Sequence, residues 1–329
     1  VLMVAHNNPD PDAIATGWAL CKLIGERLGK PGRVIAGGAV SRAENRRMIQ
    51  LLKPPLDIVD NLETNPDDAI VLVDCNPLAN NHLLQNTSIR PVAVIDHHGP
   101  ELGSFRVPFR DLRPRTAASA TIAAQYIREQ QVEPGSDLAT AMIYALRTDT
   151  RTEQPTLSRL DKSAIAWLTP KADHEKLAGI ENAPLPRSYY ADMLLAMENT
   201  FIHDGAALCF LPQASGPETV AEIADLLVRC EGIHRVLCVA MVEGDVYLSA
   251  RSSPRGGDAN AALQAVLKGL GRGGGHRHRA GGKVPAAACD GIAGPDLHNE
   301  LRNRWLAACK IEQQRGTRLV PRREILEHL

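Results

Sequence analysis

The chain has 329 residues, of which 44% are hydrophobic and 23% are charged, and its formal net charge is −1. This length exceeds what one hydrophobic core usually organises, so two domains are expected. The near-neutral charge excludes a strong bulk attraction to long nucleic acid or to an anionic membrane, and any phosphate-bearing partner is expected to be small.

The first half of the chain alternates short β-branched runs with longer amphipathic segments, which is typical of βαβ units on a parallel sheet. Strands are expected at residues 1–5, 33–35, 70–73 and 92–95. Helices are expected at residues 12–28, 42–52, 116–129, 137–146 and 160–168. The predicted fold class is therefore α/β, with a doubly wound, mainly parallel sheet in an N-terminal domain over residues 1–180.

A proline-containing break near residues 180–186 precedes the second half, and a linker helix is expected within residues 181–200. The predicted elements that follow are a strand at 206–211, a helix at 220–228, a hairpin of 235–242 with 245–251, a helix at 259–267, a strand at 283–286 and a helix at 297–308. These elements indicate a smaller α/β domain with a mixed sheet over residues 201–311. Residues 312–329 form a charged tail without a core pattern.

Seven cysteines are scattered along the chain without CxxC pairs. This spacing favours buried free thiols in a reducing compartment over a disulfide framework or a zinc site. The sequence contains neither an apolar run of about 18 residues nor a signal-peptide pattern. We therefore expect a cytoplasmic protein, monomeric or homodimeric, that does not associate with a membrane.

Acidic residues and histidines follow several apolar segments of the N-terminal domain, and we interpret all of these positions as strand ends. They are His6, Asp10 and Asp12, then Asp74, then Asp96-His97-His98, and finally Asp149. Open α/β sheets place their sites at the carboxyl edge, where such side chains would meet. Carboxylate oxygens and imidazole nitrogens together suit divalent metals. The pattern predicts a two-metal hydrolase.

Each of these side chains also has a simpler explanation. One of Asp10 and Asp12 could only cap the following helix, and Asp74 could be an ordinary turn residue. The joint arrangement favours metal binding, because two ions about 3.5 to 4 Å apart need a bridging carboxylate. His97 and His98 are adjacent, so we expect that their rings cannot reach the same ion and that one binds metal while the other faces substrate.

The second domain contains a glycine-rich run with interleaved arginine and histidine at residues 271–282. Glycines let backbone N–H groups approach a ligand closely, and the basic side chains supply charge for phosphate. A flexible hinge is the alternative interpretation. Upstream, Arg251 offers a further anion contact, or else a simple exposed arginine. Ser119, near Arg115 at an expected helix start, could bind an anion or merely cap the helix.

These motifs together closely resemble those of the DHH phosphoesterase family with its associated C-terminal domain, over about residues 1–310. The motifs in question are His6-x3-Asp10-x-Asp12, Asp74, Asp96-His97-His98, Asp149, Ser249-Ala250-Arg251-Ser252, Gly273-Gly274-Gly275-His276 and Ala280-Gly281-Gly282. The group includes nano-RNases, phosphatases of 3′-phosphoadenosine 5′-phosphate (pAp), RecJ nucleases and exopolyphosphatase-related proteins. Family II pyrophosphatases share the first domain but carry a different C-terminal domain.

The resemblance implies a manganese-dependent hydrolase, with magnesium or cobalt as alternative metals, whose active cleft lies between two domains. One ion would be held by His6, Asp10, Asp74 and Asp149, and the other by Asp12, Asp74, His97 and Asp149. Asp74 would bridge the ions, and Asp149 is a second candidate for this role. The implied catalytic residues are His98, Asp74 and Asp96, with His98 on the scissile phosphate. The implied substrate contacts are Arg115, Ser119, Arg251, Ser252, Gly274, Gly275 and His276.

The expected function is hydrolysis of short oligonucleotides or nucleotide (bis)phosphates by a metal-bridging hydroxide, without a stable complex with long nucleic acid. Arg279 departs from the resemblance, since a small residue usually stands there, and it makes the glycine-rich run unusually basic. Two alternatives stay open. One is an inorganic pyrophosphatase or polyphosphatase, and the other is a non-catalytic nucleotide sensor.

Overall fold

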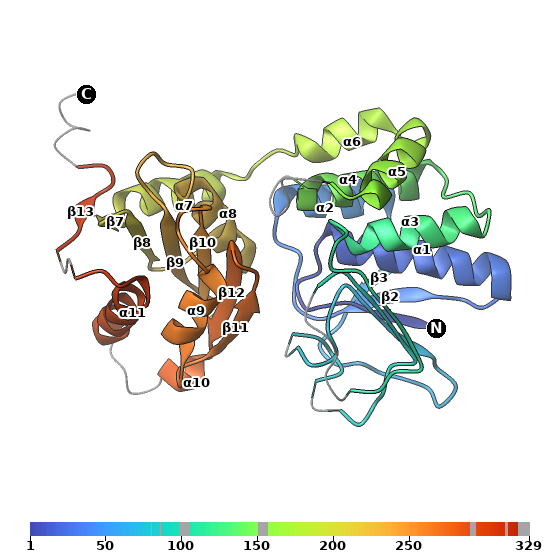
Figure 1. Cartoon of the computed structure of the whole chain (residues 1–329), viewed down its shortest axis with the longest axis horizontal. Helices are drawn as coiled ribbons and strands as arrows, with labels where there is room; N and C mark the ends of the chain where they lie inside the picture. The colour runs from blue at the N-terminus through green and yellow to red at the C-terminus, as the bar shows by residue number, and fades with distance from the viewer. Residues whose placement is uncertain are drawn as a thin grey trace. The chain divides into compact units, whose positions relative to one another are not determined.

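The computed structural model describes residues 1–79, 81–85, 87–98, 105–150, 157–289, 294–312 and 315–321 (Figure 1). Two compact units make up the chain, Val1–Pro184 and Leu185–Leu329. Within the described part, no helix is long and apolar enough to span a membrane. The thiols of Cys21, Cys75, Cys209, Cys230, Cys238 and Cys309 are free, and all of these except Cys230 are buried.

The first unit is built on a six-stranded sheet in which every pairing is parallel. Its strand order is β3-β2-β1-β4-β5-β6. The strands are β1 (Leu2–Val4), β2 (Arg33–Ala36), β3 (Leu56–Ile58), β4 (Ile70–Val73), β5 (Ala93–Asp96) and β6 (Phe109–Leu112). The predicted α/β class with a mainly parallel sheet is confirmed.

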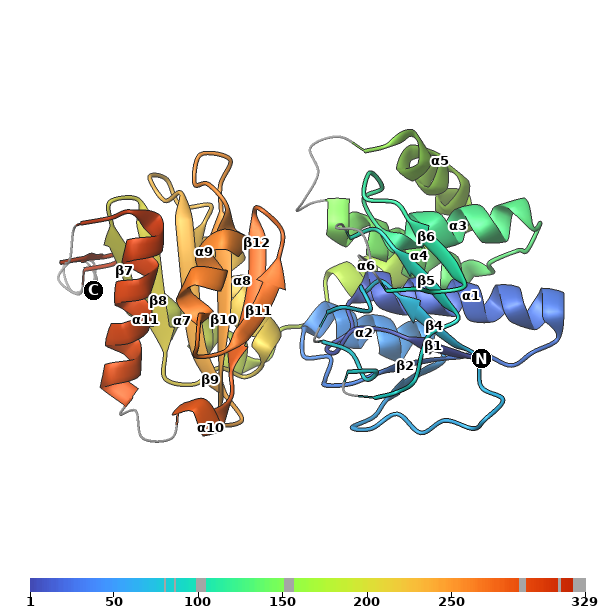
Figure 2. The ribbon, with the colours of Figure 1, turned by 60° about the horizontal axis from the view of Figure 1, so that its bottom comes forward.

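Helices of the first unit gather over the sheet, as Figure 2 shows. They are α1 (Pro11–Leu28), α2 (Ala43–Leu52), α3 (Ser119–Glu129), α4 (Ser136–Thr150), α5 (Arg159–Leu168) and α6 (His174–Glu181), with a 3-10 turn at Thr169–Lys171. Side chains of α1 and α3 pack on one face of the sheet, and α4 packs behind them in a largely helical core. The opposite face buries Val4 and Leu72 against connecting segments that include Leu84.

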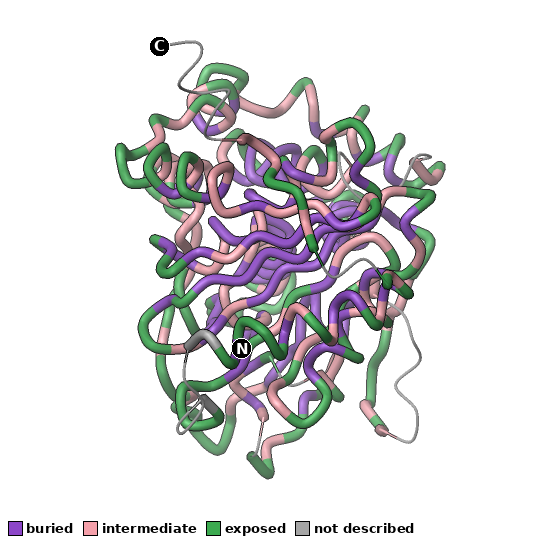
Figure 3. Tube along the Cα trace, turned by 90° about the vertical axis from the view of Figure 1, so that its left-hand side faces the viewer, coloured by how far each residue is buried: buried purple, intermediate pink, exposed green. Residues whose placement is uncertain are grey.

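The second unit contains a mixed sheet of order β11-β12-β10-β9-β8-β7-β13, in which only β8 and β9 pair in parallel among the described strands. The strands are β7 (Thr200–His203), β8 (Ala206–Leu211), β9 (Arg235–Val242), β10 (Asp245–Ser252), β11 (Arg272–Gly275), β12 (Arg279–Val284) and β13 (Thr317–Arg318). Buried strands run through its middle (Figure 3). The predicted mixed sheet is thereby confirmed.

Helices cover both faces of this second sheet. They are α7 (Arg187–Glu198) and α8 (Pro217–Leu227) on one face, and α9 (Ala259–Leu267) and α11 (Gly294–Cys309) on the other, with the short α10 (Ala286–Cys289) beside them. The expected linker helix corresponds to α7, which belongs to the second unit. Part of the expected charged tail forms β13, while residues 322–329 lie outside the described residues.

The glycine-rich run is not the flexible hinge that was the alternative interpretation, because most of it forms the antiparallel pair β11–β12. Glycine is a poor strand former, yet close packing requires it here. A Cβ at Gly273 or Gly282 would lie 2.6 or 2.4 Å from the Leu267 side chain. At Gly275, where φ is 152°, a Cβ would lie 2.3 Å from the Arg279 carbonyl oxygen.

Candidate metal centre

The segment from His6 to Asp12 connects β1 to α1. Asp10 is the N-cap of α1, where its Oδ1 accepts a hydrogen bond from the Ala13 N–H at 3.0 Å, and Pro11 occupies the first helical position. The same Asp10 oxygen lies 3.7 Å from His6 Nε2. The carboxylate of Asp10 therefore caps α1 and is also a candidate metal ligand.

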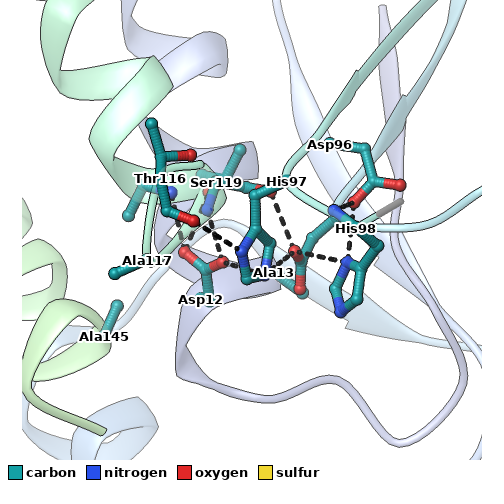
Figure 4. Close-up of polar contacts among 12 residues, drawn as sticks. Asp12, Ala13, Asp96, His97, His98, Thr116, Ala117, Ser119 and Ala145 are labelled. Carbon is teal, nitrogen blue, oxygen red and sulfur yellow. Dashed lines mark hydrogen bonds and ion pairs between the residues drawn. The ribbon is translucent and has the colours of Figure 1, made fainter. Parts of the chain in front are cut away.

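Asp12 lies fully buried in the first turn of α1. Its Oδ2 accepts from the Ser119 N–H and its Oδ1 from the Ala120 N–H, both at 2.7 Å, so the first turn of α3 holds this carboxylate (Figure 4). Burial, with the negative charges of Asp74 and Asp10, raises the pKa of Asp12 well above its usual value. A cation bound beside Asp12 would offset the cost of burying its negative charge.

Asp74 follows β4 and occupies the centre of the cluster. Its φ of 54° is a left-handed conformation that aspartate tolerates better than most residues, and such outliers gather at functional sites. Three imidazoles surround its carboxylate: His6 Nε2 is 3.6 Å from Oδ2, while His97 Nε2 at 3.5 Å and His98 Nδ1 at 3.6 Å approach Oδ1. Burial would raise the pKa of Asp74, but these histidines hold it well below its usual value.

The rings of His97 and His98 lie edge to face, with centroids 4.3 Å apart. The His97 Nε2 is 3.8 Å from Asp12 Oδ2, and its Nδ1 contacts the Thr116 carbonyl oxygen at 3.3 Å. Both rings therefore approach Asp74, and the expectation that the two cannot reach one ion is wrong. The strand β5 ends at Asp96, so the alternation of side chains along a strand does not extend to these two histidines.

Asp96 orients the second of these rings. Its Oδ1 accepts from the His98 backbone N–H at 3.0 Å and contacts His98 Nδ1 at 2.7 Å. Asp96 is fully buried, and its Oδ2 has no hydrogen-bond partner among the described residues. Burial lowers the pKa of His98, but Asp96 and Asp74 outweigh this and raise it to about 10.

Three groups of potential ligand atoms each lie within 4.8 Å of one another in the described part of the chain. They are His6, Asp10 and Asp74; Asp74, His97 and His98; and Asp12, His97 and Asp149. All six ligands implied by the resemblance are among them. The donor set of carboxylate oxygens and imidazole nitrogens fits divalent ions such as Mn²⁺. Asp74 belongs to two of these groups, and a carboxylate shared in this way is what a paired-ion site would require.

Asp149 reaches this cluster from a different element than expected. It lies in the last turn of α4, so the interpretation as a strand end is wrong. The four residues from Arg147 to Thr150 contain no glycine or proline and continue the helix. The carboxylate nevertheless comes together with Asp12 and His97.

Ser119 supports the ligands and is fully buried, which argues against the expected contact with substrate. Its hydroxyl donates to Asp74 Oδ1 at 2.9 Å while its N–H holds Asp12. Sequence reasoning missed Asp161, which accepts from the Ala117 N–H at 3.0 Å and the Thr121 hydroxyl at 2.6 Å. The capping box of Ser158 and Asp161 was a signal for that position.

The other expected substrate contacts stay predictions. Arg115 is exposed before α3. In the second unit, Gly274 is exposed on β11, whereas Ser252 is buried and its hydroxyl donates to the carbonyl oxygens of Ser253 and Gly257. Ser252 is therefore already engaged within its own unit. None of the clustered ligand atoms in the described part comes from the second unit.

The chain is similar to several known proteins. Residues 1–146 match the model of the DHH family, N-terminal domain. The chain is 31% identical over 314 residues to an uncharacterized protein of Methanocaldococcus jannaschii, a match that covers 95% of the chain and 63% of that protein. It is 27% identical over 199 residues to a protein of Bacillus licheniformis named "Probable manganese-dependent inorganic pyrophosphatase", covering 60% of each. The chain thus spans less than two thirds of these relatives.

Two solved structures share the fold. An exopolyphosphatase-related protein from Bacteroides fragilis superimposes with a TM-score of 0.71 at 16% identity, covering 94% of this chain and 92% of that one. RecJ of Thermus thermophilus in complex with Mn²⁺ gives a TM-score of 0.51 at 14% identity, covering 94% of this chain and 52% of that one. At such identities the likeness concerns the fold alone.

Proposed function

We propose that this chain, whose residues 1–146 match the model of the DHH family, N-terminal domain, hydrolyses short oligonucleotides or nucleotide (bis)phosphates with two divalent metal ions. The observation that carries the proposal is the convergence of Asp12, Asp74 and His97 with three further candidate ligands on one partly buried site. Manganese is the proposed metal, because the pyrophosphatase relatives are named manganese-dependent.

Bound ions at this site would supply an activated water and neutralise the charge that develops on the phosphate. The protein's own contribution begins with Asp74, which lies within reach of two of the three ligand groups. Because Asp74 faces all three histidines, it is the proposed bridging ligand.

His98 is the proposed contact to the scissile phosphate. Asp96 fixes its Nδ1, which orients the ring and favours a charged imidazolium that can donate a hydrogen bond to a phosphate oxygen. In this assignment Asp96 is a positioning residue, since it reaches the reaction only through His98.

The second unit is proposed to bind the remainder of the substrate through β11 and the turn at His276. A Cβ at Gly274 would meet no atom within 4 Å, so the backbone there is open to a ligand. Short nucleotides fit this proposal better than long nucleic acid, because the net charge of the chain is only −1.

An inorganic pyrophosphatase is the second candidate, and the identity to such proteins over 60% of the chain favours it. A substrate panel with Mn²⁺ separates the two functions. It should contain pyrophosphate, a nucleotide bisphosphate, di- to pentanucleotides and cyclic dinucleotides. Turnover of di- to pentanucleotides or of the bisphosphate well above that of pyrophosphate supports the proposal. Exclusive turnover of pyrophosphate contradicts it, and binding of nucleotides without any turnover indicates a sensor.

A further inference from the structure

Two arginines of the second unit share one carboxylate oxygen. Arg251 on β10 and Arg279 on β12 stand directly opposite each other in the antiparallel register. The Nε of Arg251 lies 2.6 Å from Asp225 Oδ1, and the Nη2 of Arg279 lies 2.9 Å from the same oxygen. Asp225 belongs to α8, so these two ion pairs connect the helix to the sheet.

The two guanidinium groups are in different situations. The Arg251 side chain is 9% exposed, and its Nη1 also donates to Ser249 Oγ at 2.7 Å and to the Ala250 carbonyl oxygen at 2.9 Å. The Arg279 side chain is 28% exposed. Arg251 is therefore held inside the unit, whereas Arg279 is the more accessible of the two to a ligand.

An uncovered backbone surface adjoins Arg279. Gly281 follows it by two residues and so shares its face of β12, and Gly274 pairs with Gly281 on β11. A Cβ at either glycine would meet no atom within 4 Å. Two guanidinium groups around one carboxylate leave a net charge of one positive unit, so this surface has an excess of cationic donors at its edge.

We propose that Arg279 determines specificity by binding a terminal phosphate monoester of the substrate, and that Asp225 and Arg251 position its guanidinium group. The inference rests on the proposed function. A terminal monoester carries about 1.5 to 2 negative charges near neutral pH, against one for a bridging diester. A guanidinium fork binds two oxygens of such a group at once.

The test measures calorimetric binding to the full chain in EDTA, with a 5′-phosphorylated dinucleotide and the same dinucleotide without its terminal phosphate as probes. The wild type should bind the phosphorylated form about 10-fold or more tightly, the effect expected of a charge-assisted hydrogen bond. Arg279→Ala should abolish this preference and leave the affinity for the unphosphorylated probe unchanged, which also shows that the variant is folded. Arg279→Lys should restore the preference only in part, because lysine lacks the fork.

Arg187→Ala is the matched control. Arg187 is exposed at the start of α7 in the same unit, in none of the segments proposed to bind substrate, and its removal changes the net charge of the chain by the same amount. It should leave the preference intact. An equal loss in Arg187→Ala and Arg279→Ala would overturn the proposal, because it would indicate general attraction to positive charge. A wild type without preference in EDTA would overturn it as well.

Asp225→Asn tests the positioning role by the sign of its effect. If Asp225 only adds negative charge near an anion site, its neutralisation should tighten binding of the phosphorylated probe. If it positions Arg279, the same change should weaken that binding by about 3- to 10-fold, because the amide oxygen of asparagine can still accept a hydrogen bond from Arg279 but without the help of charge. Tighter binding would contradict the assigned role.

A separate assay of dinucleotide hydrolysis in Mn²⁺ distinguishes a failure of this inference from a failure of the proposed function. Turnover of dinucleotides by a wild type that shows no Arg279-dependent preference would contradict the inference alone. An Arg279-dependent preference in EDTA, without turnover of any nucleotide in Mn²⁺, would contradict the proposed hydrolase and leave the phosphate subsite standing.

Discussion

The hydroxyl of Ser119 donates to Asp74 Oδ1 at 2.9 Å, so a residue at the start of α3 fixes the carboxylate at the end of β4. The Ser119 N–H donates at the same time to Asp12 Oδ2. One residue thus sets the orientation of two proposed ligands that come from separate elements. Outer partners of this kind orient ligands and tune the affinity for metal.

Ser119→Ala should weaken Mn²⁺ binding by about 10- to 100-fold, the usual range for loss of an outer-sphere partner. The backbone N–H to Asp12 remains, so both ions should still bind at high concentration. Titration calorimetry with Mn²⁺ measures the effect. Ser136→Ala, an exposed serine at the start of α4, is the control and should bind like the wild type. An unchanged affinity in Ser119→Ala would show that its hydroxyl does not position Asp74.

Asp74→Asn should abolish turnover and reduce the number of bound Mn²⁺ ions below two, because a neutral amide cannot bridge two cations as a carboxylate does. Metal analysis after dialysis, together with the nucleotide assay, measures both effects. The control is Asp57→Asn, which removes an exposed carboxylate from the edge strand β3. Near-normal activity with two bound ions would contradict the bridging role.

The buried contact between Asp96 and His98 predicts a change that proton NMR can follow in the metal-free protein. Asp96→Asn should lower the pKa of His98 from about 10 toward its ordinary value of 6.5, since Asp96 makes the largest favourable contribution to the charged ring. Asp111→Asn removes a carboxylate that instead holds Arg113 and should leave His98 unchanged. If His98 titrates identically in the wild type and in Asp96→Asn, Asp96 does not hold the ring in its charged form.

Stability should depend on pH with opposite sign in the metal-free and metal-loaded forms. The folded pKa of His98 is raised, so its contribution to stability is complete below its unfolded value of 6.5 and is lost as the pH rises toward about 10. The raised pKa values of His6 and Asp12 act in the same direction. Metal binding instead needs deprotonated ligands, so the affinity for metal, and the stability that bound metal adds, rise with pH.

Thermal unfolding from pH 6.5 to pH 10 should therefore show a falling Tm in EDTA and a steady or rising Tm in Mn²⁺ over the lower part of this range. In His98→Gln, which cannot be protonated, the fall in EDTA should be smaller. Parallel curves with and without Mn²⁺ would contradict the coupling between these protonations and metal binding.

The sequence was sufficient to predict much of the candidate site, because strand ends are marked by a change from apolar to acidic residues. Asp74 and Asp96 follow nearly continuous apolar runs, and the register of parallel strands brings such ends together. Asp149 was assigned to the correct cluster but to the wrong element, since a resemblance between motifs carries no information on whether a strand or a helix presents the residue.

The sequence did not predict the edge strands β3 and β6, nor the carboxylate of Asp225 that two arginines share. The strands β3 and β6 are partly exposed and contain Asp57 and Arg110, so they lack the apolar run that marks a central strand. In the sequence, Asp225 lies on the polar side of an amphipathic helical pattern. Such a position predicts a carboxylate that is exposed to solvent. Its role depends on Arg251 and Arg279, which strand pairing alone places together.

The central claim is that this chain is a two-metal phosphoesterase acting on short nucleotides, and the most direct test is hydrolysis of a 5′-phosphorylated dinucleotide as the Mn²⁺ concentration is raised. We predict no turnover in EDTA, turnover that appears only as two Mn²⁺ ions bind, and no turnover in Asp74→Asn at any Mn²⁺ concentration. Turnover in EDTA, or turnover that is complete with a single bound ion, would contradict the account.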